Sequence, residues 1–480
     1  MRITTLEKPR PKQSRNRWSF CRLFIAAVLS AVLCCTAASA ALIRVGVAVD
    51  KPAVTFKGSA RIKDARGRSV SVSGTFTVQA HNGSVRIKGK NYASPVTLSS
   101  RQPLVCDGRP YEGDFRLTAR GGRVTAVNSL DVEKYLRGVL GFEVNPKWHL
   151  EVLKAQAVIS RTFALKQLGR HNSAGFDVCP TDHCQIYRGT AVSNTRTDTA
   201  ISQTRGQVVT YGGKLAQTYF CSDSGGATAD VRDVWGGSIP YLTVRREPFP
   251  SQSPKSNWQT VLTEAEIRKA LTRKGLSVGT VRSVSIVKRD SAGRAVSLKF
   301  TGTSGSSVMS SAAFRTLVGT KNVPSTFFDF SPLSSAPSSR RSAPQTRNSY
   351  SAKTEYDTTP LTPEQDALLE SLIHQKRFSA ADRVDMLMYP ERRMHYLKKA
   401  LGQNAENTAP QLSSAPPRPS LSAAGSGTGK LEGGKLTLYG RGWGHGIGLS
   451  QWGAKAMAEN GWSAVQILQF YFPGTKIQKR

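Results

Sequence analysis

One acidic residue, Glu143, has surroundings that suit acid–base chemistry. It lies between the apolar residues Phe142 and Val144, and apolar side chains recur at helical spacing from Leu150 onward. Burial among apolar neighbours raises the pKa of a carboxyl group, whereas a nearby helix N-terminus lowers it, and the sequence leaves both directions open. Most of the 32 acidic residues are expected to be solvated surface charges, so these neighbours alone do not make Glu143 catalytic.

The backbone around Glu143 is predicted to form a turn that leads into a helix. Gly138 and Gly141 permit a sharp bend, and Asn145 followed by Pro146 is a helix-start signal. We therefore expect Glu143 to be presented just outside the N-terminus of a rigid helix.

A second set of residues with chemical potential lies in the stretch HNSAGFDVCPTDHCQIYRG. It supplies four candidate metal ligands: His171, Cys179, His183 and Cys184. Two imidazoles and two thiolates suit tetrahedral Zn²⁺. Because four protein ligands leave no position for a reactive water, such an ion would be structural.

A disulfide is the alternative to zinc at this stretch. Outside the cell, Cys179 and Cys184 could pair, and Cys106 could pair with Cys221. Metal analysis of the purified protein distinguishes the two states.

Several separated segments resemble the stage II sporulation protein D family. The helical segment after Glu143 reads EVLKAQAVISRTFAL, and a C-terminal stretch reads GRGWGHGIGLSQWGA followed by QILQFYFPGTKI. The segments YEGDFRLTARGGRVTAVNSLDVEKYLRGV and CSDSGGATADVRDVWGGSIPYL also follow the family pattern. Together these motifs extend over residues 42–335 and 430–478 in the family's order.

The resemblance implies a peptidoglycan lytic transglycosylase whose single catalytic glutamate is Glu143. Such an enzyme protonates the leaving oxygen of the bond between N-acetylmuramic acid (MurNAc) and N-acetylglucosamine (GlcNAc). The same carboxylate then takes a proton from the sugar's C6 hydroxyl, which closes a 1,6-anhydro ring with an entropic advantage over free water. A hydrolase ordinarily needs two carboxylates, and no acidic partner for Glu143 is obvious in the sequence. Family members tend to act on strands already stripped of stem peptides, which implies a partner amidase.

Five further residues are predicted to contact substrate. His445 is flanked by glycines that permit close approach of ligand, and Gln451 falls in the first turn of a predicted helix. Arg161 occupies the place of the family's ART arginine and could hold Glu143 or substrate, although a helix salt bridge is the ordinary alternative. Ser222 and Ser224 could hydrogen-bond sugar hydroxyls, or simply form a turn. The zinc cluster also has a counterpart in some members of the resembled family.

Two other functions remain open from the sequence. Relatives of this domain include activators of wall amidases, so the chain could be a non-enzymatic glycan-binding module. A zinc hydrolase would need an open coordination position, which the fourth ligand disfavours. No serine-nucleophile elbow is evident.

The N-terminal residues are predicted to direct export. Basic residues precede an apolar core from Leu23 to Leu33, among them Arg2, Lys8, Arg10, Lys12, Arg15 and Arg17, and a small-residue stretch ends at Ala40. We expect cleavage after Ala40, with an uncleaved anchor as the alternative because the mostly apolar run continues to Ile43. The working location is then the periplasm, the cell envelope or the outer face of the cytoplasmic membrane, with membrane attachment only through this segment.

The chain is strongly basic, with a formal net charge of +35 over 480 residues. Such a charge attracts polyanions in the same compartment. Outside the cytoplasm, anionic wall polymer or lipid is the expected partner and nucleic acid is not.

The expected fold class is α+β: a strand-rich mixed domain with a few helices packed on it, interrupted by a largely disordered insertion. Residues 1–40 are the export signal, 41–130 a strand-rich N-terminal part and 131–334 the catalytic core. Residues 335–429 are a Ser/Pro-rich insertion with a helical patch, either a tolerated loop or a basic tether, and 430–480 complete the core. Within the core, TEAEIRKALTRKG predicts an amphipathic helix, and the runs around Ser291–Gly293 predict a hairpin.

Overall fold

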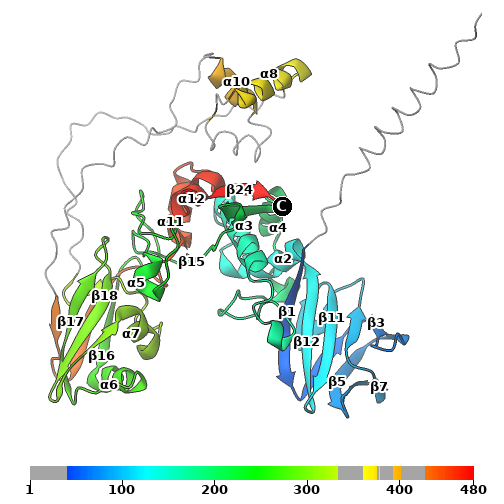
Figure 1. Ribbon diagram of the computed structural model, residues 1–480, viewed down its shortest axis with the longest axis horizontal. Coiled ribbons are helices and arrows are strands. Elements are labelled where there is room, and N and C mark those ends of the chain that lie inside the picture. Colours follow the sequence, from blue (N-terminus) through cyan, green and yellow to red (C-terminus); the bar gives the residue numbers. More distant parts are fainter. Residues whose placement is uncertain (1–40, 333–360, 376–377, 379–392, 402–426) are drawn as a thin grey trace, which may run out of the picture. The chain divides into compact units, whose positions relative to one another are not determined.

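The computed structural model describes residues 41–332, 361–375, 378, 393–401 and 427–480 (Figure 1). The predicted export signal and much of the 335–429 insertion lie outside the described residues. Within the described residues, no helix combines the length and apolar character needed to cross a bilayer.

The N-terminal part consists of two six-stranded antiparallel sheets. Their strand orders are β1-β12-β11-β8-β3-β4 and β10-β9-β2-β5-β6-β7. Alternation of polar and apolar residues turns one face of each sheet inward, so that Phe56 of one sheet and Phe115 of the other meet edge to face at 5.0 Å. The strands are β1 Leu42–Lys51, β2 Ala53–Lys57, β3 Ala60–Lys63, β4 Ser69–Val72, β5 Thr75–His81, β6 Ser84–Ile87, β7 Lys90–Tyr92, β8 Val96–Ser99, β9 Leu104–Cys106, β10 Arg109–Tyr111, β11 Asp114–Arg120 and β12 Arg123–Asp131.

Three helices follow the last of these strands. They are α2 Val132–Glu143, α3 Leu150–Lys166 and α4 Thr195–Gln203. Every residue of α3 from Glu151 to Ala164 is buried, which makes it the central helix of this region (Figure 1). Two short 3₁₀ helices, η1 Asn172–Ala174 and η2 Gly189–Val192, lie between α3 and α4.

The remaining strands join segments from both sides of the insertion. Strand β24 pairs with β13, β23 runs parallel to β15, β22 lies between β16 and β20, and β21 pairs with β17. The strands are β13 Gln207–Tyr211, β14 Lys214–Leu215, β15 Phe220–Cys221, β16 Trp258–Thr263, β17 Val281–Arg289, β18 Ala295–Gly302, β19 Gly305–Ser310, β20 Phe328–Asp329, β21 Thr428–Lys430, β22 Lys435–Gly440, β23 Leu449–Ser450 and β24 Lys476–Lys479. The helices are α5 Val231–Trp235, α6 Glu264–Arg273, α7 Ser311–Val318, α11 Gln451–Glu459 and α12 Ala464–Tyr471.

Local sequence signals in this region are confirmed. Helix α6 begins at a capping box in which Thr263 and Glu266 exchange side-chain-to-backbone hydrogen bonds. Strands β17 and β18 form the predicted antiparallel hairpin. Within the insertion, the described residues contain α8 Pro363–His374 and α10 Arg393–Ala400, where the helical patch was expected. The strand-rich α+β class is therefore confirmed.

Candidate active site and metal site

Glu143 is the last residue of helix α2 and does not lie in a turn outside a helix, as the glycines had suggested. Gly138 and Gly141 are both helical. A Cβ at Gly138 would lie 2.4 Å from Cε2 of Tyr187, and one at Gly141 would lie 2.0 Å from the carbonyl oxygen of Val192. These glycines are required for close packing between segments and not for a bend.

The start of helix α3 also differs from the prediction. The side chain of Asn145 accepts a hydrogen bond from the Lys147 amide, whereas α3 begins at Leu150 with His149 as its N-cap. Glu143 is therefore at a helix C-terminus and not just before an N-terminus. The unpaired carbonyl groups of a helix C-terminus favour the protonated form of a carboxyl group, so the expected opposing dipole is absent.

Glu143 is a partly exposed residue, and the proton affinity of its carboxyl is altered by its surroundings. Burial raises its pKa to about 7, against the opposing effect of a 3.4 Å hydrogen bond that the Ile186 amide donates to Oε1. Among the described residues, no charged neighbour contributes to this shift. The group is thus divided between its acid and base forms near neutrality, which is the condition that suits general acid–base catalysis.

Gln451 connects the C-terminal motif to the end of α2 that carries Glu143. It is the first residue of α11, as predicted, and is only 7% exposed. Its Nε2 donates to the backbone oxygen of Glu143 at 3.0 Å and to Oε1 of Gln156 at 3.4 Å. Because the last carbonyls of a helix have no intrahelical partner, Gln451 satisfies one of them and holds the end of α2 in place.

His445 lies in the glycine-rich loop between β22 and β23. Its Nδ1 accepts a 3.0 Å hydrogen bond from the Ile447 amide. Burial, reinforced by the charge of Arg315, lowers its pKa to about 4. The ring is therefore neutral near pH 7 and stands next to Trp235, with 4.9 Å between centroids. Among the described residues, the hydrogen bond from the C-terminal motif to Glu143 comes from Gln451 and not from His445.

The two serines of the SDSGG loop have different surroundings. Ser224 is fully buried, and its hydroxyl donates to Oε1 of Glu247 at 2.7 Å. It is therefore committed to the interior and does not present its hydroxyl to a sugar, contrary to expectation. Ser222 is partly exposed, and its backbone oxygen accepts from the Trp452 amide at 3.0 Å, so it remains a candidate.

Arg161 is an interior residue and not the substrate contact that the sequence suggested. Its side chain is fully buried, and it forms a bidentate pair with Glu133 at 2.9 and 2.7 Å. It also donates to the backbone oxygens of Gln207 and Ile201. The salt bridge joins two helices, α3 and α2. The sequence had suggested, as the alternative to a substrate contact, an ordinary helix salt bridge between residues three or four positions apart.

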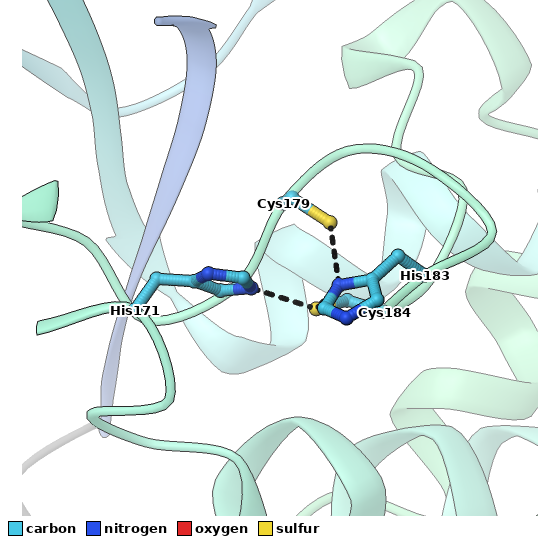
Figure 2. Close-up of side chains that lie close together, drawn as sticks. All are labelled: His171, Cys179, His183 and Cys184. Carbon is cyan, nitrogen blue, oxygen red and sulfur yellow. Dashed lines mark hydrogen bonds between the residues drawn. The ribbon is translucent and has the colours of Figure 1, made fainter.

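The four predicted metal ligands lie together in one loop, and Figure 2 shows their side chains turned toward a common point. The ligand atoms of His171, Cys179, His183 and Cys184 all lie within 4.8 Å of one another. His171 Nε2 is 3.4 Å from Cys184 Sγ, and His183 Nδ1 is 3.5 Å from Cys179 Sγ and 3.6 Å from Cys184 Sγ. Tetrahedral zinc with Zn–S of about 2.3 Å and Zn–N of about 2.0 Å puts sulfur and nitrogen about 3.5–3.6 Å apart, so these spacings fit the ion.

The cysteines and His171 of this loop are compatible with metal binding, and because burial raises the pKa of the Cys184 thiol to about 11, a metal bound there has to displace its proton. Among the described residues the four cysteines, Cys106, Cys179, Cys184 and Cys221, are free thiols. Burial and the neighbouring His183 and Arg170 lower the pKa of His171, which keeps its ring neutral. Only a neutral imidazole offers a lone pair to a metal.

The ligand loop runs directly into the backbone that touches Glu143. Ile186, whose amide donates to the carboxyl, follows Cys184 by two positions. The intervening Gln185 accepts a 3.1 Å hydrogen bond from the hydroxyl of Tyr135 on α2. Fixing the loop therefore fixes a donor to the candidate catalytic group.

Sequence reasoning missed three contributors to this region. The Ile186 amide gives no side-chain signal, because any residue except proline carries such a donor. Gln156 lies inside an apolar helix whose pattern predicts burial, and its link to Gln451 spans the insertion. Trp235 lies next to His445. Its position just before two glycines was only a weak indication of a functional role.

Comparisons with known proteins find one matching family model and several similar proteins. A family model described as stage II sporulation protein matches residues 120–211, which include Glu143 and the four clustered ligands. The amidase enhancer of Bacillus subtilis is 25% identical over 408 residues, or 83% of this chain and 48% of that protein. Stage II sporulation protein D of Bacillus subtilis is 28% identical over 161 residues, or 30% of this chain and 47% of that protein.

An uncharacterised protein of Brachyspira hyodysenteriae is 29% identical over 238 residues, or 49% of this chain and 63% of that protein. The chain therefore spans about half, or somewhat more, of the length of these curated relatives.

Proposed function

Because this chain belongs to the stage II sporulation protein D family, we propose that it is a peptidoglycan lytic transglycosylase. It cleaves the MurNAc–GlcNAc bond of glycan strands and leaves a 1,6-anhydro end. The observation that carries the proposal is Glu143, a partly exposed residue whose carboxyl has a pKa of about 7 and which stands where the family pattern has its acid.

Glu143 performs both proton transfers. Its protonated carboxyl gives a proton to the glycosidic oxygen as the bond from that oxygen to C1 of MurNAc breaks, and GlcNAc leaves as an alcohol. The resulting carboxylate takes the proton of the C6 hydroxyl, and O6 attacks C1 to close the anhydro ring. Glu143 ends protonated, as it began. A group with a pKa near the operating pH serves both steps.

The surroundings of Glu143 support a single-carboxylate reaction. Retaining hydrolases place a second carboxyl about 5–5.5 Å away, and a like charge within about 4–6 Å raises a carboxyl's pKa. In the described part of the chain, burial and the Ile186 hydrogen bond are the influences on Glu143, and no acidic residue is among them.

The His171, Cys179, His183 and Cys184 cluster holds a structural zinc ion in this proposal. Zinc bound there would be closed to water, so the chemistry that it supplies is cross-linking of the loop. The loop in turn sets the Ile186 amide against Glu143.

The second candidate function is a non-enzymatic activator of a wall amidase. One observation favours it: the relative whose match spans 83% of this chain is named an amidase enhancer. Under either function, the partners are peptidoglycan strands and a wall amidase rather than nucleic acid. The chain is exported, with residues 1–40 as its signal or, if uncleaved, its membrane anchor.

Mass spectrometry of products tests the proposal. Purified protein is incubated with peptide-free and with peptide-bearing glycan strands. Anhydro-ended fragments, formed faster from peptide-free strands, are the expected result. Reducing ends would identify a hydrolase, freed peptides an amidase, and intact strands that bind the protein would support the activator.

A further inference from the structure

Trp235 is a large aromatic side chain that remains half exposed next to the glycine-rich motif. Its relative exposure is 49%. The ring packs edge-on against Tyr219 at 4.8 Å and lies at an angle of 46° to His445 at 4.9 Å. One part of the indole is therefore supported by two other rings while the rest is open to solvent.

The backbone that carries Trp235 is held from several directions. Trp235 ends the five-residue helix α5, whose N-cap Asp230 accepts from the Arg232 amide. Gly236 follows at a φ of 81°, a conformation that glycine adopts without strain. Asp233 pairs with Lys288 of β17 at 2.8 Å. An exposed ring on so constrained a turn loses little freedom when it binds a ligand.

Helix α3 links this ring to the candidate catalytic group. Gln156 contacts Gln451, whose side chain holds the Glu143 carbonyl. Phe163 contacts Tyr219 at 6.4 Å, and Tyr219 supports Trp235. Gln156 and Phe163 are seven positions apart, hence on one face of α3, and separated by about 10 Å along its axis. One face of α3 therefore contacts both the side chain that holds the Glu143 carbonyl and the ring that supports Trp235.

We propose that Trp235 is a sugar-binding platform. An N-acetylhexosamine of the glycan strand, at a position other than the scissile bond, stacks its apolar face on the indole. One face of a pyranose ring presents mainly C–H groups, and a flat indole buries them without requiring a hydrogen bond. Tyr219 and His445 position the indole from behind. This inference rests on the proposed function, because it assumes that a glycan strand occupies the region beside Glu143.

Binding of an N-acetylglucosamine tetramer and of peptide-free strands, measured by calorimetry, tests the platform. The parent protein carries Glu143→Gln so that the ligand is not consumed. Adding Trp235→Ala is expected to weaken binding of both ligands by roughly tenfold or more, since truncated aromatic contacts dominate such losses. Trp235→Phe keeps a flat ring and is expected to stay within about threefold of the parent.

Tyr211→Ala is the matched control. Tyr211 is 42% exposed and packs on another ring, Tyr241, but it lies on β13 and not beside His445. Its loss should leave binding unchanged. Unaltered thermal unfolding confirms that each variant is folded. Equal binding by the parent and by Trp235→Ala, or equal weakening by Tyr211→Ala, overturns the platform. If wild-type protein neither binds nor cleaves strands, the proposed function fails as well, whereas cleavage with unchanged Trp235→Ala binding overturns the platform alone.

Discussion

The two glutamates of helix α2 are placed in opposite environments. Glu133 lies in the first turn, is 8% exposed and accepts hydrogen bonds from Arg161 and from the Gly206 amide. Glu143 lies at the other end of the helix. Among the described residues, no charged neighbour shifts its pKa. The first position stabilises a negative charge through the helix dipole and a guanidinium, and the second disfavours it.

The difference separates a structural carboxylate, Glu133, from the proposed catalytic one, Glu143. The Glu133 carboxylate accepts hydrogen bonds from a guanidinium and a backbone amide, and these contacts tie it into the packing of α2 against α3. A carboxyl that is desolvated without compensation binds its proton more tightly and releases it near neutral pH. The same residue type, ten positions apart on one helix, therefore serves two purposes.

The largest expected effect is on catalysis. Glu143→Gln removes the acid and base but keeps the shape, and the cleavage rate should fall by roughly 10²–10⁴-fold. Strand binding should remain. The rate is measured on purified peptide-free strands, with Glu459→Gln, an exposed glutamate on α11, as the control. Unchanged product formation by Glu143→Gln would remove Glu143 from the mechanism.

Loss of the paired arginine tests the structural end of α2. Arg161→Ala leaves Glu133 buried without its partner and should lower the free energy of unfolding by about 3–5 kcal/mol. Arg123→Ala breaks the exposed pair with Asp50 and should cost no more than about 1 kcal/mol. Chemical denaturation measures both. Similar small losses for the two variants would contradict the structural role of the Arg161 pair.

Removal of a proposed zinc ligand tests the connection between the loop that carries the four His and Cys residues and Glu143. Cys184→Ser should abolish stoichiometric zinc and accelerate hydrogen exchange at the Ile186 amide by roughly tenfold or more. Cys106→Ser, outside the cluster, should retain the metal. Zinc content and amide exchange of the folded proteins provide the measurements. Well-folded wild-type protein that holds no zinc and whose Cys179 and Cys184 are oxidised would show that the disulfide alternative is right.

A smaller effect is expected on the pH dependence of stability. Because the pKa of Glu143 is raised from 4.5 to about 7 in the folded state, the folded state binds more protons than the unfolded state between these values. Stability contributed by this group is present at low pH and declines as the pH rises toward 7. Glu143→Gln should therefore raise the melting temperature relative to wild type more at pH 8 than at pH 4. An equal change at both values would mean that the carboxyl is not desolvated.

Local periodicity was sufficient to predict much of the fold. The β17–β18 hairpin, helix α6 and the start of α11 depend on short-range patterns and end signals, and these agree with the structure. The four His and Cys side chains are close in sequence, and the structure brings their ligand atoms together.

Features that depend on distant contacts could not be predicted in this way. Gly138 and Gly141 suggest a turn until Tyr187 and Val192 are known to pack against them. A one-dimensional pattern likewise gives no partner for Arg161, since Glu133 is on another helix.

The pH dependence of kcat/KM on peptide-free strands tests the central claim most directly, because it reports the essential ionisations of the free enzyme. A single carboxyl that must begin protonated predicts a rate that is constant in mildly acidic solution and falls above a pKa of about 7. A bell-shaped profile, with a second limb falling toward acidic pH, would show that a second ionised carboxylate is required and would contradict the account.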